Sequence, residues 1–203
     1  MQTRSGARDR RTQIIEAAIG QLAEHGDSRA TFARIVEAGG LSSPGLISYH
    51  FADRGELLES VYLYVAELRR AANDRALAGS TDPVARLRTA LRADTEFFAA
   101  RPELFAAVVE AFHGLRDPAG RLKHLGETRS EDKMLELLRA AGEASATAAS
   151  ADPAETDLRS LALIIDGAQT QFLALLHRRP ELDVEAFIRT LTRVALTGIG
   201  RAS

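Results

Sequence analysis

The residues that could carry out chemistry in this chain fall in two places, and the first of them does not favour catalysis. Glu110 and His113 form an E-x-x-H pair on a predicted helix, which is the spacing found in carboxylate-bridged di-iron bundles. Such a site needs a second pair and two further glutamates, but the sequence holds one pair and no cysteine. Phosphate-binding glycine loops and the G-x-S-x-G and H-E-x-x-H motifs are also absent from the sequence. We therefore expect no enzyme, no metal site and no cofactor.

The second place is the stretch from Thr31 to Phe51, where two short helical patterns are joined by a glycine turn. Apolar side chains of both helices can pack against a preceding apolar helix, and this packing fixes the angle of the second helix. The opposite face of the second helix is then free to enter the major groove of DNA. A helical hairpin with no role in DNA binding would give the same pattern. The packing residues would be Ile35, Ile47 and Phe51 with Ile15, Ile19 and Leu22, and the free face would hold Ser43, Gly45, Ser48 and Tyr49.

Composition and charge describe an ordinary soluble globule of 203 residues with a net charge of −2. The longest apolar runs have about five residues, whereas a membrane helix needs about 20, so we expect no membrane partner. The basic N-terminus is not followed by an apolar core, so no secretory signal is predicted. The first 11 residues hold four arginines against a single aspartate. This basic arm could contact phosphate or could be a solvated, disordered tail. The expected location is the cytoplasm.

The elements that must position these residues are helices, because no stretch alternates as a strand does. Capping residues and prolines place the helix starts, and glycines place the ends. The predicted caps include Thr31, Ser43 before Pro44, and Asp82. The sequence therefore predicts an all-α fold of about nine helices. Their expected ranges are 8–24, 31–38, 43–51, 53–77, 83–100, 102–113, 121–142, 153–178 and 184–199.

The first quarter of the chain resembles the DNA-binding domain of the tetracycline-repressor (TetR) family of bacterial regulators. That family has an apolar first helix ending in glycine, a threonine that opens the second helix and a turn of small residues. An aromatic pair then closes the recognition helix, and a basic residue precedes an acidic-leucine pair. The matching stretches are IIEAAIGQLAEHG at 14–26, TFARIVEAGGLS at 31–42, YHF at 49–51 and ADRGELL at 52–58.

The resemblance implies a three-helix helix-turn-helix DNA-binding domain over residues 1–54 and a larger helical ligand-binding and dimerisation domain over residues 55–203. The sequence departs from the family at SSPG, 42–45, which holds an extra residue, so the register of the recognition helix is open by one position there. Ser48 falls where the family usually has a phosphate-contacting tyrosine. The residues carried over as DNA contacts are Thr31, Arg34, Ser43, Pro44, Gly45, Leu46, Ser48, Tyr49, His50 and Arg54.

Leu46 has two possible roles, because it could touch a thymine methyl group or belong to the core. The basic residue Arg54 stands where the family has a lysine, and its guanidinium suits phosphate.

The second half of the chain is expected to pair two copies and to bind a small molecule. One short recognition helix reads only a few base pairs, so useful specificity needs two. The last two helices carry long apolar stripes, which could form a four-helix interface or pack within the chain. The dimer residues would be Leu161, Ile165, Phe172, Leu176, Phe187, Leu191 and Val194. The resemblance implies an effector pocket, although phenylalanines at helical spacing are usually plain core and polar residues on such helices are usually on the surface. The candidates are Phe97, Phe98, Phe105, Val109, Glu110, Phe112, His113, Asp166 and Gln169.

The sequence is thus interpreted as that of a ligand-responsive regulator of transcription. Its partners would be a double-stranded DNA operator, a second copy of itself and an unknown small-molecule effector. In the common case of the family it would be a repressor that leaves its operator when the effector binds. The alternative is a helical interaction protein, or a member of the family whose DNA binding has decayed.

Overall fold

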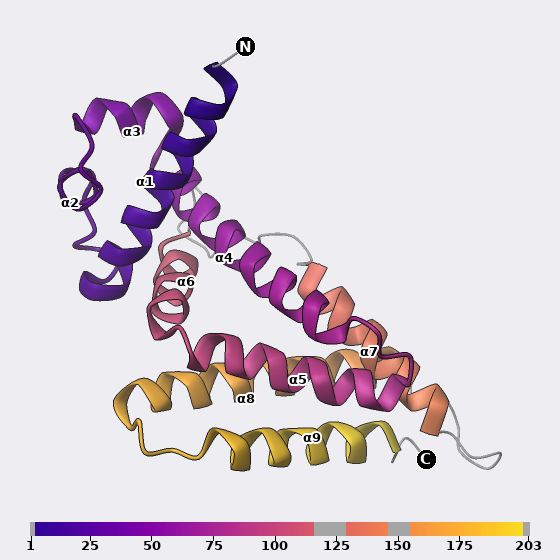
Figure 1. Ribbon diagram of the computed structural model, residues 1–203. Coiled ribbons are helices and arrows are strands. Elements are labelled where there is room, and N and C mark those ends of the chain that lie inside the picture. The colour runs from indigo at the N-terminus through magenta and orange to yellow at the C-terminus, as the bar shows by residue number, and fades with distance from the viewer. Residues whose placement is uncertain (1–2, 116–128, 146–154, 201–203) are drawn as a thin grey trace. The chain divides into compact units, whose positions relative to one another are not determined.

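The computed structural model describes residues 3–115, 129–145 and 155–200, and all regular structure in these ranges is α-helical (Figure 1). The predicted all-α fold is therefore confirmed, with nine helices in the described ranges. None of these helices is long and apolar enough to cross a membrane. The helices are α1 (Thr3–His25), α2 (Phe32–Ala38), α3 (Pro44–His50), α4 (Arg54–Leu77), α5 (Pro83–Ala99), α6 (Pro102–Gly114), α7 (Arg129–Ser145), α8 (Glu155–Arg178) and α9 (Val184–Gly200).

The helix bounds follow the predicted ranges with two differences. α1 begins at Thr3 rather than at Arg8, and residues 3–7 contain no proline that would break the helix. α7 ends at Ser145, three residues beyond the predicted end at residue 142. The expected residues 121–128 and 153–154 lie outside the described ranges.

The chain folds as two compact units. The first unit contains residues 1–68 and 101–125, and so includes α1, α2, α3, the first part of α4 and α6. The second contains residues 69–100 and 126–203, with the end of α4 and with α5, α7, α8 and α9. α6 thus packs with the helix-turn-helix, although the sequence prediction places it beyond residue 54. The functions predicted for residues 1–54 and 55–203 stay predictions.

Local capping explains where several helices begin. The Thr31 hydroxyl oxygen accepts the Arg34 N–H at 3.4 Å, and an Asp82 carboxylate oxygen accepts the Ala85 N–H at 2.6 Å. Both residues are predicted helix caps, and both predictions are confirmed. Ser43 differs, since its side chain makes no capping bond. The Leu46 N–H bonds instead to the backbone oxygen of Ser43 at 3.1 Å, which closes the first turn of α3 after Pro44.

The first unit is built around the apolar face of α1, which contacts α2 and α6, while α2 contacts α3. In Figure 1, α2 is seen end-on and α3 lies across the view. The turn between them needs glycine at position 40, where φ is +57°. The six residues predicted to pack this core are all buried: Ile15, Ile19, Leu22, Ile35, Ile47 and Phe51.

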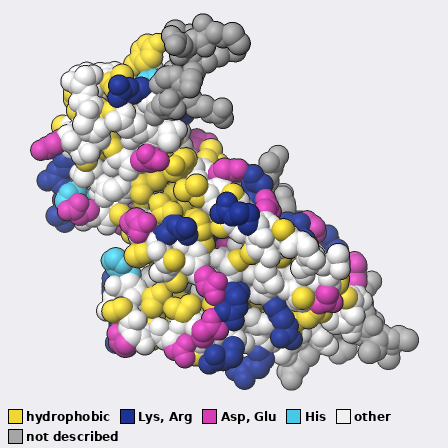
Figure 2. Space-filling model, viewed as in Figure 1, with side chains coloured by type: hydrophobic (Ala, Val, Ile, Leu, Met, Phe, Trp, Pro, Cys, Tyr) yellow, Lys and Arg dark blue, Asp and Glu magenta, His cyan; other side chains and the backbone are white. Residues whose placement is uncertain are grey.

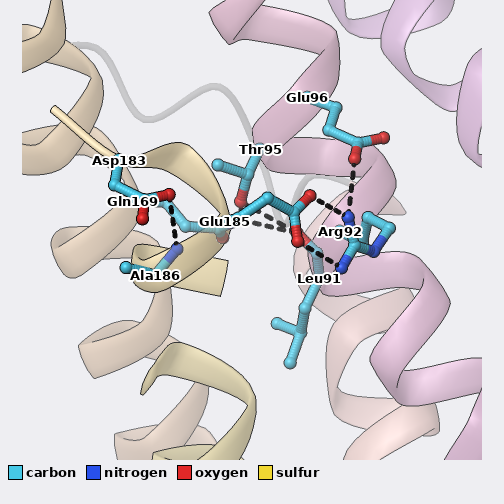
Figure 3. A network of polar contacts seen from close by, with 8 residues as sticks. All are labelled: Leu91, Arg92, Thr95, Glu96, Gln169, Asp183, Glu185 and Ala186. Atoms are coloured by element: carbon cyan, nitrogen blue, oxygen red, sulfur yellow. Dashed lines mark hydrogen bonds and ion pairs between the residues drawn. The ribbon is translucent and has the colours of Figure 1, made fainter. Parts of the chain in front are cut away.

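The second unit is a helical bundle in which α5 contacts α7, α8 and α9. Among its described residues, the buried side chains are apolar except for those of Thr95 and Gln169. The Arg92 guanidinium on α5 pairs with Glu185 on α9 and with Glu96 on its own helix (Figure 3). The core residues of this unit include Leu87, Leu91, Leu138, Leu158, Leu161, Ile165, Leu191, Ala195 and Ile199.

Replacing the fully buried Phe51 by alanine should destabilise the chain by about 3–5 kcal/mol, because it leaves a cavity under α3. Urea unfolding followed by circular dichroism measures this free energy. Tyr49→Ala is the matched control, since Tyr49 is an aromatic residue of α3 that is 82% exposed and should change stability by no more than about 0.5 kcal/mol. Equal losses in the two variants would contradict the register of α3 described above.

Candidate nucleic-acid interface

The exposed face of α3 gathers most of the residues that the sequence predicts as DNA contacts. Ser43, Pro44, Gly45, Ser48 and Tyr49 are exposed. Between them, the fully buried Ile47 fixes the helix to the core. α3 therefore presents one polar side to solvent and is held rigidly by the other, which is the arrangement that a helix needs to enter a major groove.

Two residues with aromatic rings, Tyr49 and His50, lie at the C-terminal end of α3. Tyr49 is 82% exposed, and its ring meets the His50 ring edge-on, with 5.1 Å between the ring centroids. Leu46 and His50 are half-buried. A phenol and an imidazole at the end of a helix can both donate hydrogen bonds to phosphate oxygens.

The start of α2 supplies two further predicted contacts, Thr31 and Arg34, and both are exposed. The Thr31 hydroxyl oxygen is used as an acceptor for the helix cap, so its own hydrogen remains available for donation. The Arg34 guanidinium has no ion-pair partner within the part of the chain that the structure describes. Thr31 and Arg34 therefore carry hydrogen-bond donors that are free to bind DNA. They lie at the start of α2, the helix that precedes the recognition helix in a helix-turn-helix.

Arg54 is predicted to contact phosphate, yet it makes several bonds within the protein. Its guanidinium donates to the Ala30 oxygen at 2.8 Å, to the Asp27 oxygen at 2.5 Å and to the Asp27 carboxylate at 2.7 Å. These bonds use three of its five N–H donors. The side chain is 37% exposed. Arg54 thus ties the first residue of α4 to the turn that precedes α2.

Arg11 is a site residue that the sequence reasoning missed. Its guanidinium donates to the backbone oxygen of His50 at 2.5 Å, to Glu56 at 3.0 Å and to the Ser60 hydroxyl at 2.9 Å. It also lies over the Phe51 ring, 4.2 Å from the ring centroid. Arg11 therefore anchors the last turn of α3 from α1.

A sequence signal for this role of Arg11 existed. The residue precedes Ile15 by four positions and Ala18 by seven, so it lies on the buried stripe of α1 rather than in a solvated arm. The carboxylate of Glu56 accepts the Ala52 N–H at 2.7 Å and the Arg11 guanidinium. These two bonds lower the pKa of Glu56. The side chains of the first nine residues, which include Arg4 and Arg8, lie outside the described residues.

The structure divides the predicted effector-pocket residues between the two units. The aromatic pair Phe97 and Phe98 is buried in the second unit, with ring centroids 5.1 Å apart. Among the others, Phe112 and His113 are exposed. The remaining members of the first unit are Phe105, which is buried, and Val109 and Glu110, which are half-buried. The oxygen of the Glu110 carboxylate accepts the Asp27 N–H at 2.8 Å.

The polar pocket candidates Asp166 and Gln169 lie on α8. The Gln169 amide donates to the Thr95 hydroxyl at 2.9 Å, and that hydroxyl donates to the Leu91 oxygen at 2.8 Å (Figure 3). Asp166 is exposed by its accessible surface, yet desolvation by the surrounding protein atoms raises the pKa of its carboxyl, although Arg69 opposes the shift. In the described ranges, no three side chains of the kinds that bind metals lie close enough together to hold an ion.

The predicted dimer residues on α8 and α9 fall into two groups. Leu161, Ile165 and Leu191 are buried in the core of their own chain, because α8 and α9 pack against α5 and α7. Val194 is 42% exposed. The half-buried members are Leu176 and the pair Phe172 and Phe187, whose rings stack with centroids 3.9 Å apart.

Other apolar side chains of α8 reach the surface. Leu163, Ile164 and Leu175 are 68%, 59% and 48% exposed. Hydrophobic side chains appear among charged ones where α8 and α9 meet the surface (Figure 2). A shallow groove there is lined by Leu161, Ile164, Arg193, Val194, Thr197 and Gly198.

Comparison with solved structures supports the fold. A fatty acid degradation regulator, FadR from Bacillus halodurans, has a TM-score of 0.69 and 19% identity, covering 92% of this chain and 94% of that one. A TetR transcription regulator from Haloarcula marismortui has a TM-score of 0.68 and 24% identity, and the match covers 95% of this chain and 97% of that one. At these identities the likeness establishes the fold alone.

Comparison with sequences identifies the family. The model of the family described as bacterial regulatory proteins, tetR family, matches residues 14–61. The probable acrEF/envCD operon repressor of Escherichia coli K12 is 30% identical over 112 residues, which is 55% of this chain and half the length of that relative. The HTH-type transcriptional regulator BetI of Burkholderia cenocepacia HI2424 is 30% identical over 155 residues, or 70% of this chain and 78% of the relative. The chain therefore belongs to the TetR family of bacterial regulatory proteins.

Proposed function

We propose that this chain is a ligand-responsive regulator of transcription that binds operator DNA as a homodimer. The single observation that carries the proposal is the geometry of α3. Its polar face is open to solvent, while Ile47 and the adjoining Phe51 are buried beneath it, with at most 1% of either side chain exposed. A rigid, outward-facing helix of two turns is suited to reading base edges in a major groove.

The proposed DNA contacts are sorted by what each group can bind. Thr31, Tyr49, His50 and Arg34 carry donors for phosphate oxygens, which position the protein on the duplex. The remaining candidates, Ser43, Pro44, Gly45, Leu46 and Ser48, lie where base edges would be read. Arg54 keeps free donors for a phosphate contact, although its main bonds tie α4 to the turn before α2.

The proposed dimer face uses the exposed apolar residues of α8 and α9. Leu163, Ile164, Leu175 and Val194 have no cover within the described part of the chain that would exclude water from them. Burying them between two copies is favourable, at about 25 cal/mol for each Å² of apolar surface. A dimer would also supply the second recognition helix that specificity requires.

We place the proposed effector site in the second unit, where polar groups occur inside an apolar helical bundle. The Asn73 side-chain oxygen is buried without a hydrogen-bond partner in the described residues. The Asn73 amide nitrogen bonds to Asp94, which pairs with Arg69. Buried polar groups cost free energy unless they are paired, so a ligand donor here would be favourable. Two relatives are named as a repressor and as a transcriptional regulator, and we propose repression relieved by the effector.

A second candidate function is that of a family member whose DNA binding has decayed. Ser48, which replaces the usual phosphate-contacting tyrosine, favours this alternative. Tyr49 opposes it, because a phenol that is 82% exposed stands one position away. If the proposed function is correct, the protein acts in the cytoplasm, where it can reach the chromosome.

The purified chain should bind the DNA immediately upstream of its own gene in a gel shift. Binding should weaken steeply with salt, because each phosphate contact releases counterions. Tyr49→Ala should weaken binding to all duplexes without changing the circular dichroism spectrum. A wild-type chain that binds this DNA no better than an unrelated duplex, with a flat salt dependence, would support the decayed alternative.

Arg11→Ala should weaken DNA binding by about tenfold, the effect of losing one charge-assisted hydrogen bond, because the end of α3 loses its anchor. The matched control is Arg10→Ala, which removes the same charge from an exposed residue bonded only to Gln13 in the described structure. Fluorescence anisotropy with a labelled duplex measures both affinities. Equal losses would mean that Arg11 acts through its charge alone.

Ile164→Glu combined with Val194→Glu should convert the dimer into a monomer, because the interface would bury two carboxylates without partners. Sedimentation equilibrium measures the mass in solution. Leu63→Glu, at an exposed leucine of α4, is the control and should leave the oligomeric state unchanged. A doubly substituted chain that remains dimeric would place the interface elsewhere.

A further inference from the structure

A carboxylate of α6 reaches across the first unit to the turn between α1 and α2. An oxygen of Glu110 accepts the backbone N–H of Asp27 at 2.8 Å, and the two residues are 83 positions apart in the sequence. The bond supplies the acceptor for an amide that follows the end of α1. Because Glu110 is half-buried, the bond is partly shielded from water, which strengthens it.

The same turn is tied from its other side to the start of α4. The Asp27 carboxylate lies 2.7 Å from the Arg54 guanidinium, which also holds the backbone oxygens of Asp27 and Ala30. Glu110, Asp27 and Arg54 thus form a continuous chain of charge-assisted bonds. We call these three residues the α6 latch.

Close packing at the end of α6 supports the latch. A Cβ atom at Gly114 would lie 2.8 Å from the Asp27 carboxylate carbon and 2.7 Å from a methyl carbon of Leu58. A side chain at position 114 would therefore require the Asp27 and Leu58 side chains to shift. α6 therefore holds the turn both by shape and by the Glu110 hydrogen bond.

The latch lies at both ends of the segment that carries the proposed DNA contacts. Asp27 and Ala30 precede α2, and Arg54 begins α4 three positions after Phe51. All of these residues belong to the first unit. The latch therefore joins the turn that precedes α2 to the first residue of α4, which follows α3, and so fixes both ends of the segment that contains α2 and α3.

We propose that Glu110 is a positioning residue that holds the helix-turn-helix in its DNA-binding orientation through the α6 latch. The inference rests on the proposed function and adds a residue that itself contacts no DNA. A chain whose binding-competent orientation is less populated has a proportionally weaker apparent affinity.

The direction of the change in DNA affinity in Glu110→Ala distinguishes this positioning role from a simple effect of charge. Removing a carboxylate from a DNA-binding unit favours binding to a polyanion. The latch predicts the opposite for Glu110→Ala, whereas Glu110→Gln keeps an oxygen that can accept the Asp27 N–H. Glu103→Ala removes the same charge from an exposed position of α6 and serves as the control.

The experiment measures the affinity of the full-length variants for the DNA upstream of the chain's own gene, at a temperature where circular dichroism shows each one folded. Glu110→Ala should bind about five- to tenfold more weakly, somewhat less than the full loss of a hydrogen bond to a charged group, because the turn is also held by Arg54. Its salt dependence should match that of the wild type, because no phosphate contact is lost. Glu110→Gln should bind like the wild type, and Glu103→Ala should bind equally or more tightly. A Glu110→Ala variant that binds as tightly as the wild type overturns the proposal.

Amide hydrogen exchange tests the latch without DNA. Peptides covering residues 24–31 should exchange faster in Glu110→Ala than in the wild type, and Glu110→Gln should restore the protection. Unchanged exchange in Glu110→Ala overturns the latch. A wild-type chain that fails to bind DNA overturns the proposed function instead, so the two failures are distinguishable.

Discussion

The burial of Ile47 and Phe51 in the core is the interaction on which the helix-turn-helix of the first unit depends. α3 has seven residues, and an isolated helix of this length does not form in water because nucleation costs more than so few bonds return. The helix therefore exists only where its apolar side is covered. That same constraint leaves its polar side, with Tyr49 at its end, facing outward.

Apolar burial holds one side of α3 in the core, and two arginines fix the last turn of α3 and the turn before α2. Arg11 holds the backbone oxygen of His50 and covers the Phe51 ring. Arg54 holds the turn before α2. Both guanidiniums bond to backbone oxygens, which orient more rigidly than side chains do, and a planar guanidinium can reach two such groups at once. Arg11 and Arg54, which the sequence suggests as phosphate contacts, thus stabilise the fold of the first unit.

The second unit follows a different plan, in which apolar packing is interrupted by a few satisfied polar bonds. Thr95 and Gln169 lie in the interior and bond to each other and to the Leu91 oxygen. Such networks favour one packing arrangement of neighbouring helices over alternatives, because a shifted helix would leave buried groups unpaired. An effector that supplied other partners to this interior would change the preferred arrangement, which is the requirement for a two-state regulator.

The sequence by itself determined the helices, the caps at Thr31 and Asp82 and the buried face of the helix-turn-helix. These features are local, because the helical period and the turn chemistry are set by residues within a few positions of each other. Only the tertiary structure decided that Arg11, Arg54 and Glu110 bond across the first unit, since their partners lie between 24 and 83 positions away. It likewise decided that Leu161, Ile165 and Leu191 are covered by their own chain. An apolar stripe shows that a helix face is buried, but the period carries no information about which surface covers it.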